Sequence, residues 1–112
     1  MKRVLAGLVG VAALAVGLGF AAPAAADPDT AFSNELHTYG IYGQKDYNAW
    51  IGKITCKRLA TNLDANAFEA ADFVHNQLEK DATTEQAWQF LAAGLRTYCP
   101  DKLYVLDQAP RQ

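Results

Sequence analysis

The side chains of this chain that could carry chemistry are few: two cysteines, two histidines and a single serine. Ser33 lies four residues before His37, and a helix would place the hydroxyl and the imidazole on one face. Such a pair could in principle activate a hydroxyl for hydrolysis. No Gly-x-Ser-x-Gly elbow surrounds Ser33, however, and a four-residue spacing is common on helices. We therefore expect surface or capping roles and no enzyme, with a small hydrolase kept as an alternative.

Haem capture is a second chemistry to weigh, because imidazole and phenolate groups ligate haem iron. The candidate ligands are His37, Tyr39, Tyr42 and His75. His37 and Tyr39 are two residues apart and would point to different sides of a helix, so they could not share one iron. We expect no cofactor and keep a carrier of haem or of a small apolar or lipid ligand as the alternative. The sequence contains no Asp-x-Asp-x-Asp loop, and we expect no metal site.

Residues 1–26 have the features of a secretory signal peptide. Lys2 and Arg3 give a cationic start, an apolar run from Val4 to Phe20 follows, and the segment ends in Ala-x-Ala at Ala26. An uncleaved anchor is the alternative, since 23 residues can span a bilayer. Pro23 and the high glycine and alanine content favour cleavage after Ala26. We expect a protein in the cell envelope or outside the cell, with no stable membrane insertion after cleavage.

Cys56 and Cys99 are the two cysteines, with 42 residues between them. Two cysteines in an exported chain most often form one disulfide. A redox pair or a metal thiolate remains the alternative, but no Cys-x-x-Cys spacing is present to lower a thiol pKa. Closing a loop of this length would stabilise a small domain by about 4 kcal/mol.

The charge and length of the exported part limit what it can do. Residues 27–112 carry 8 basic and 12 acidic side chains, a net charge of −4. Nucleic-acid binding needs clustered Lys and Arg, so we expect no nucleic-acid partner. The length allows one small domain, which we place at 27–102 with a C-terminal tail at 103–112.

The elements that position these residues are predicted to be helices. The first spans about 28–39 and ends at Gly40, and the second runs from Tyr47 to about Ala60 with Asp46 as its cap. A third begins at Asn62 or Asp64. The fourth follows the capping box Thr83-x-x-Gln86 and is stopped by Pro100. Leu103–Leu106 suits a docked extended strip. The fold class is all-α, a compact array of about four short helices stapled by one disulfide.

The order of several short motifs resembles one known family. These motifs are Asp27-Pro28-Asp29, a tyrosine–glycine loop, Cys56 late in a helix, Thr83-Thr84-Glu85-Gln86-Ala87 and Tyr98-Cys99-Pro100. They look like the small secreted mycobacterial and actinobacterial proteins catalogued as domain of unknown function seven hundred and thirty-two, over about residues 27–100. Thr84 stands where the usual pattern has proline. The resemblance implies a secreted helical domain with one disulfide and carries no established activity, so no catalytic residue transfers.

Aromatic side chains supply the remaining functional hypothesis. Six of them could line an apolar cleft rather than the core: Tyr47, Trp50, Trp88, Phe90, Tyr98 and Tyr104. Core packing is the default on helical stripes, and Tyr47, Trp50, Ile51 and Ile54 fall on one such stripe. We expect a non-enzymatic interaction module that binds an unknown protein or an apolar molecule. An enclosed cavity between the second and fourth helices would favour a carrier, and a filled core there would favour the interaction module.

Overall fold

The computed structural model describes residues 27–108, and the predicted signal peptide lies outside them. The described part is mostly helical, with no strand, and its elements are α1 (Pro28–Thr38), α2 (Lys45–Ala60), α3 (Ala67–Gln77), α4 (Thr84–Tyr98), the 3₁₀ turn η3 (Pro100–Lys102) and α5 (Tyr104–Asp107). The prediction of an all-α array stapled by one disulfide is confirmed.

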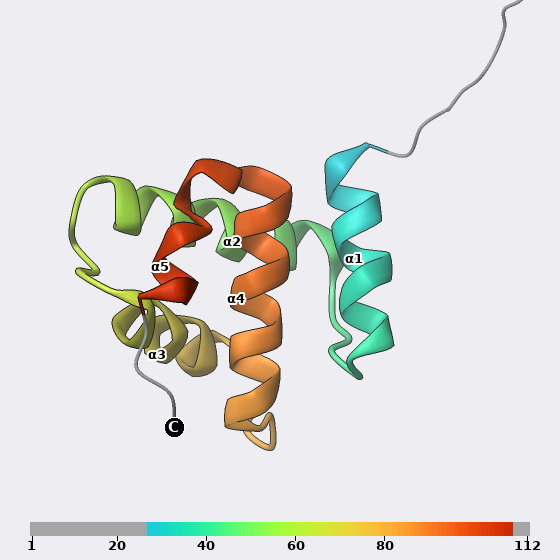
Figure 1. The fold of residues 1–112 in the computed structure, drawn as a ribbon. Helices are drawn as coiled ribbons and strands as arrows, with labels where there is room; N and C mark the ends of the chain where they lie inside the picture. The colour runs from blue at the N-terminus through green and yellow to red at the C-terminus, as the bar shows by residue number, and fades with distance from the viewer. Residues whose placement is uncertain (1–26, 109–112) are drawn as a thin grey trace, which may run out of the picture.

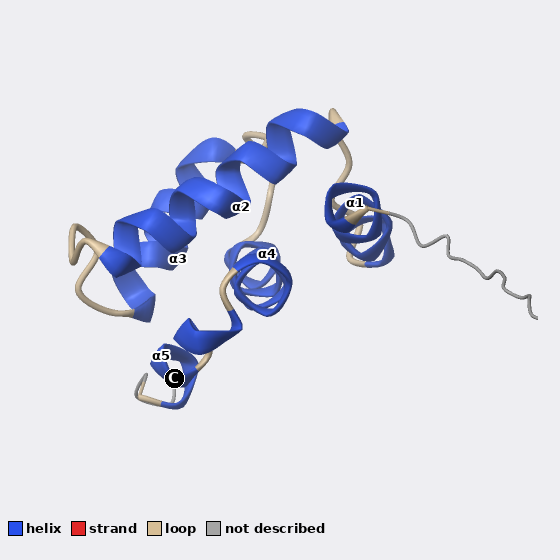
Figure 2. Ribbon diagram, turned by 90° about the horizontal axis from the view of Figure 1, so that it is seen from above, coloured by secondary structure: helices blue, strands red, loops and turns tan. Residues whose placement is uncertain are grey.

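Helix α4 is the centre of the arrangement. It packs against α1, α2 and α3, and η3 folds back from its C-terminal end. In Figure 1, α1 descends where α4 rises, so the two are antiparallel, and α2 crosses them. Figure 2 looks down the axes of α1 and α4, with α2 running across the picture. Because of this layout, the loop after α1 and the loop before α4 lie toward the same end of the molecule.

Two of the four main helices begin where the sequence predicts. The side chain of Asp27 accepts a hydrogen bond from the Thr30 amide (2.8 Å) and caps α1. Both bonds of the Thr83–Gln86 capping box are present at the start of α4. Gly40 follows α1 with φ +78°, the left-handed conformation expected after a helix end.

The predicted starts of α2 and α3 are wrong by a few residues. Gln44, not Asp46, caps α2, and Asn66 caps α3. Neither Asn62 nor Asp64 begins α3, for separate reasons. Asn62 adopts φ +63° just beyond the end of α2. The buried carboxylate of Asp64 accepts two hydrogen bonds from Arg58, at 2.8 and 3.0 Å.

The core has two parts. Side chains of α1, α2, α3 and α4 fill the first, which centres on Phe32, Ile51 and Phe90. The second joins α2, α3, α4 and α5. At the α2–α4 contact, a Cβ added at Gly94 would lie 3.7 Å from the Cα of Gly52, so the two helices nearly touch there. This crossing is filled, which is the outcome that favours an interaction module over a carrier with a cavity there.

The C-terminal segment differs from the extended strip that we expected. Residues 100–107 form η3 and the one-turn helix α5. Val105 is buried in the second part of the core, beside Leu91 and Leu95 of α4. Pro100 stops α4 as predicted but also starts the 3₁₀ turn, because its fixed φ suits the first position of a helical turn.

Candidate functional site

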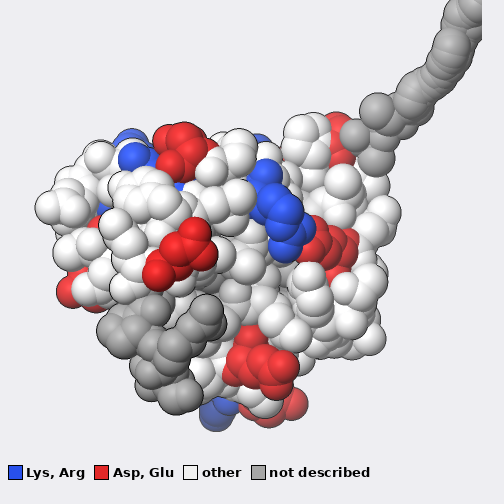
Figure 3. All heavy atoms as spheres, in the orientation of Figure 1, with Lys and Arg blue, Asp and Glu red and all other residues white. Residues whose placement is uncertain are grey.

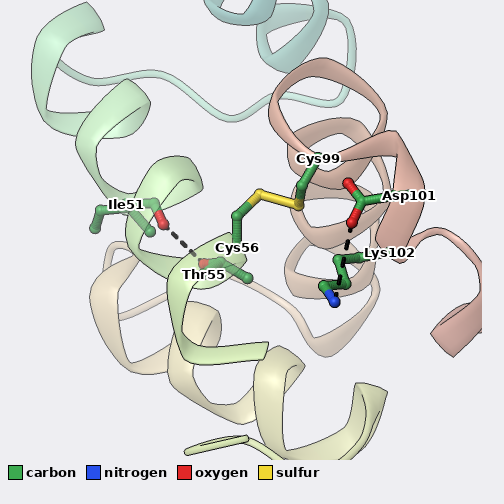
Figure 4. Close-up of a disulfide and its surroundings, with 6 residues drawn as sticks. All are labelled: Ile51, Thr55, Cys56, Cys99, Asp101 and Lys102. Atoms are coloured by element: carbon green, nitrogen blue, oxygen red, sulfur yellow. Dashed lines mark hydrogen bonds and ion pairs between the residues drawn. A yellow bond between two sulfur atoms is a disulfide. The ribbon is translucent and has the colours of Figure 1, made fainter. Parts of the chain in front are cut away.

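The disulfide joins Cys56 of α2 to Cys99 at the end of α4, with an S–S distance of 2.06 Å and a Cα–Cα distance of 6.0 Å (Figure 4). The described residues contain no other cysteine. The nearby Thr55 hydroxyl donates to the Ile51 carbonyl within α2 (2.7 Å). The bridge therefore ties together the two helices that form the filled crossing, and its role is structural.

The Ser33–His37 pair does not form a catalytic arrangement. Ser33 is only 8% exposed, and no hydrogen bond joins its hydroxyl to His37. His37 is exposed and its ring lies 5.3 Å from that of Tyr42, centroid to centroid. A nucleophile must reach both its base and its substrate, and a buried hydroxyl without that hydrogen bond meets neither condition.

The four residues considered for haem do not converge on one point. The Tyr39 hydroxyl donates to Glu35 (2.8 Å), and a ring nitrogen of His75 lies 2.9 Å from the Ala82 carbonyl oxygen. Only His37 and Tyr42 come together, as an exposed pair whose rings are tilted by 50° to each other. Within residues 27–108, no group of three or more His, Cys, Asp or Glu side chains is placed to hold a metal ion.

The aromatic residues separate into a buried set and an exposed set. Phe90 is fully buried, Tyr98 packs edge-on against Phe32 (5.2 Å), and Trp88 packs edge-on against Phe68 (5.3 Å). Phe90 lies in the core, and the partly buried Tyr98 and Trp88 pack against it.

Three other aromatics remain in solvent on adjacent parts of the chain: Tyr42 is 66% exposed, Tyr47 45% and Trp50 53%. The expectation that Tyr47 and Trp50 share the core stripe with Ile51 is therefore wrong. Ile51 is completely buried, and its neighbour Trp50 is turned outward by about 100° of helix rotation. The rings of Tyr47 and Trp50 lie 6.1 Å apart. We call Tyr42, Tyr47 and Trp50 the aromatic strip.

A cleft of about 760 Å³ opens beside the aromatic strip. It lies between the α1–α2 loop, the first turn of α2 and the α3–α4 loop. Its lining residues are Gly40, Ile41, Tyr42, Gly43, Gln44, Tyr47, Asn48, Gln77, Leu78, Glu79, Asp81, Ala82, Thr83 and Gln86. This volume falls within the range of about 300–1,000 Å³ typical of ligand sites.

Asn48 is the unusual residue of this lining. It is only 5% exposed, yet its side-chain amide makes no hydrogen bond with the described part of the chain. Buried amides are normally hydrogen-bonded, because leaving them unpaired is costly. Our sequence reasoning missed Asn48. The available signal was a polar residue on the α2 stripe that continues through Ile51, Thr55 and Leu59.

The charge of the cleft is one-sided. Its lining includes the carboxylates of Glu79 and Asp81 and no lysine or arginine. The ion pairs of residues 27–108 use other acids, namely Asp29, Glu35, Asp64 and Asp101. Lys80 lies between the two cleft acids in sequence but does not line the cleft. On the face drawn in Figure 3, acidic and basic groups are interspersed.

The strongest electrostatic effects away from the cleft serve the fold. Partial burial would raise the pKa of Glu35, but hydrogen bonds from Arg96 and Tyr39 outweigh this and lower it. Burial, and then a hydrogen bond from its hydroxyl to Asp29 (2.7 Å), raise the pKa of Tyr98. Both pairs join α1 to α4, so we assign them to stability.

The family is decided by the match of residues 28–101 to the family of proteins of unknown function DUF732. The chain belongs to this family. The described capping box and disulfide both lie within the stretch that resembled it, and the Tyr98-Cys99-Pro100 motif closes α4 in the structure. No solved structure matches the chain.

Two relatives come from Mycobacterium tuberculosis: uncharacterized protein MT0585 of strain CDC 1551 / Oshkosh and uncharacterized protein Rv0559c of strain ATCC 25618 / H37Rv. Each is 46% identical over 106 residues, which cover 94% of this chain and 93% of the relative. Among residues 27–108, no helix has both the length and the apolar character needed to cross a membrane.

Proposed function

We propose that this protein is a non-enzymatic binding module that acts in the cell envelope or outside the cell. Export is supported by the signal-like segment 1–26, and the Cys56–Cys99 disulfide suits an oxidising compartment. The absence of a Ser33–His37 hydrogen bond removes the support for a hydrolase that uses that pair.

The observation that carries this proposal is the aromatic strip beside the cleft. Tyr42, Tyr47 and Trp50 are between 45% and 66% exposed, although the core is filled by other side chains. Aromatic residues are enriched where proteins bind partners, because they bury much area and lose little conformational freedom. The strip and the cleft share Tyr42 and Tyr47, so one ligand or partner could contact both.

A carrier of haem or of a small apolar ligand is the second candidate, and the cleft volume is what favours it. The two carboxylates of the lining, Glu79 and Asp81, and the engagement of His75 with Ala82 favour it less. Titrating the purified protein with hemin tests this candidate. A Soret shift that is lost in the His37→Ala variant would support it, and an unchanged spectrum would rule out haem.

Site-specific photo-crosslinking tests the binding module. A photoreactive phenylalanine analogue at Trp50 should capture a discrete partner or ligand from culture medium and cell envelope of the producing organism. The same analogue at Tyr104, an exposed aromatic outside the cleft lining, is the matched control. Equal products at both positions, or none at Trp50, would contradict a binding role for the aromatic strip.

Export has a separate test. The intact mass of the protein recovered from culture medium should correspond to residues 27–112, with two hydrogens fewer than the reduced chain because of the disulfide. Recovery only with the cells, at the mass of residues 1–112, would contradict both cleavage after Ala26 and secretion.

A further inference from the structure

We propose that the cleft binds an extended peptide segment that carries lysine or arginine side chains. This inference rests on the proposed binding function and names the ligand of that site. Three features of the described residues support it: an unpaired buried amide, unpaired backbone donors in one wall, and acidic groups beside exposed aromatic rings.

The unpaired amide of Asn48 fits the main chain of a peptide. An asparagine side chain offers a donor and an acceptor side by side, the same pair of groups that a peptide unit presents. Asn48 is buried at the cleft wall and forms no side-chain hydrogen bond within residues 27–108. A ligand that supplies both partners would relieve the cost of this burial.

The α1–α2 loop supplies more unpaired backbone groups along the same cleft. The amides of Tyr42, Gly43 and Gln44 donate no hydrogen bond to other residues of the described chain. Tyr42, Gly43 and Gln44 are exposed and precede the first residue of α2, so their amides are accessible to a partner strand. Main-chain hydrogen bonds to such a segment are a common way to hold an extended peptide.

The acidic and aromatic groups specify a cationic side chain. Glu79 and Asp81 line the cleft without a basic neighbour in the lining, and the exposed rings of Tyr42 and Tyr47 stand in the same lining. A cation over an aromatic face is attracted by the ring, and a carboxylate adds an ion pair.

The protein holds two of its own cations by this combination. Lys53 pairs with Asp29 at 3.4 Å and lies 5.5 Å from the centre of the Tyr98 ring. Arg58 likewise pairs with an acid, Asp64, and lies 4.1 Å from the centre of the Phe73 ring. The cleft lining holds the same two kinds of group, carboxylates and aromatic rings, and contains no lysine or arginine.

The test uses the oxidised protein and three capped peptides that differ only in side-chain charge: acetyl-Gly-Lys-Gly-Lys-Gly-amide and its glutamate and glutamine counterparts. Binding is followed by ¹⁵N–¹H correlation spectra and calorimetry. We expect the lysine peptide to shift the side-chain amide signals of Asn48 and the backbone signals of Gly43, and the glutamate peptide to leave both unchanged. Added salt should weaken the binding, because the charges are exposed.

Variants separate the contributions. The double variant Glu79→Gln/Asp81→Asn should bind the lysine peptide about tenfold more weakly, since it loses two charge-assisted contacts. Asp72→Asn removes an exposed acid outside the lining and is the matched control. Asn48→Leu should lose most of the binding. If Asn48→Leu does not fold, the double variant at the exposed residues Glu79 and Asp81 still tests whether the carboxylates bind the lysine side chains.

Several outcomes would overturn the inference. They are no shift with the lysine peptide, equal binding of the glutamate or glutamine peptide, and an unchanged affinity in the double variant. A neutral oligosaccharide such as cellotriose is tested in parallel. If it alone shifted the Asn48 signals, a peptide ligand would be refuted and the proposed binding function would stand. Failure of the Trp50 crosslinking experiment would instead count against the binding function itself.

Discussion

Adding one methyl group on each side of the α2–α4 crossing should change stability in opposite directions. A Cβ added at Gly52 would lie 2.9 and 3.0 Å from two carbons of the Tyr98 ring, closer than real contacts allow. A Cβ added at Gly94 would meet its nearest atom, the Cα of Gly52, at 3.7 Å, an ordinary contact. The variants Gly52→Ala and Gly94→Ala are therefore chemically identical changes in very different surroundings.

The magnitudes follow from what each methyl group displaces. Both substitutions gain about 1 kcal/mol because alanine favours a helix interior over glycine. At Gly52 the Tyr98 ring must move, although its hydroxyl is bonded to Asp29 (2.7 Å) and its ring packs on Phe32 (5.2 Å). Overpacking costs about 1–3 kcal/mol, and loss of a hydrogen bond to a charged group about 1.5–3 kcal/mol. We expect Gly94→Ala to stabilise by about 0.5–1 kcal/mol and Gly52→Ala to destabilise by about 2 kcal/mol.

Urea unfolding of the oxidised proteins, followed by far-ultraviolet circular dichroism, measures both values. The control is the same Gly52→Ala change in a Tyr98→Ala background, which removes the two shortest contacts and leaves one with the Phe32 ring at 3.3 Å. The penalty should disappear there, and the double-mutant cycle should show a coupling of about 2 kcal/mol. A Gly52→Ala protein as stable as the parent, or the same penalty in both backgrounds, would refute the argument from the crossing.

Three further predictions concern the disulfide and two titrating groups. The Cys56→Ser/Cys99→Ser variant should lose about 4 kcal/mol of unfolding free energy relative to the oxidised protein, and the reduced parent should match it in urea unfolding. Because its pKa is lowered in the folded state, Glu35 stabilises the fold above its ordinary pKa, and this stabilisation is lost as pH falls through the folded pKa. In the Glu35→Gln variant the unfolding free energy should therefore decrease less at acid pH than in the parent. A parent whose unfolding free energy showed no such decrease would contradict the ion pair with Arg96. The raised pKa of Tyr98 gives the opposite pH dependence of stability. Its stabilisation is complete below the ordinary tyrosine pKa and is lost as pH rises through the folded pKa. The Tyr98→Phe variant should therefore not show this decrease in unfolding free energy at alkaline pH. In absorbance titrations Tyr98 should be among the last tyrosines to ionise, and early ionisation would contradict its burial.

The parts of the fold that depend on local chemistry could be predicted from the sequence. The Thr83–Gln86 capping box, the Asp27 cap and the left-handed Gly40 each involve residues close together in the chain, and all three are present. The fold class followed from helical periodicity, which needs no knowledge of the partner helix.

The features that depend on distant residues were missed. Aspartate is a common helix cap, but the carboxylate of Asp64 accepts a hydrogen bond from Arg58 and does not cap a helix. The one-turn α5 exists because Val105 finds a place in the second part of the core. The cleft joins loops some 40 residues apart, so neither Asn48 nor Glu79 could be assigned to it from spacing alone.

The close approach of α2 and α4 also explains why Trp50 lies at the surface and not in the core. With Gly52 and Gly94 at the crossing, the two helices approach until their backbones nearly touch, and no bulky ring fits between them. Phe32, Phe90 and Tyr98 fill the space beside the crossing and leave none for Trp50. Trp50 therefore remains 53% exposed. Trp50 instead pairs with the exposed ring of Tyr47 on the outer side of α2, where we propose that a partner binds, because aromatic rings bury a large area when a partner covers them.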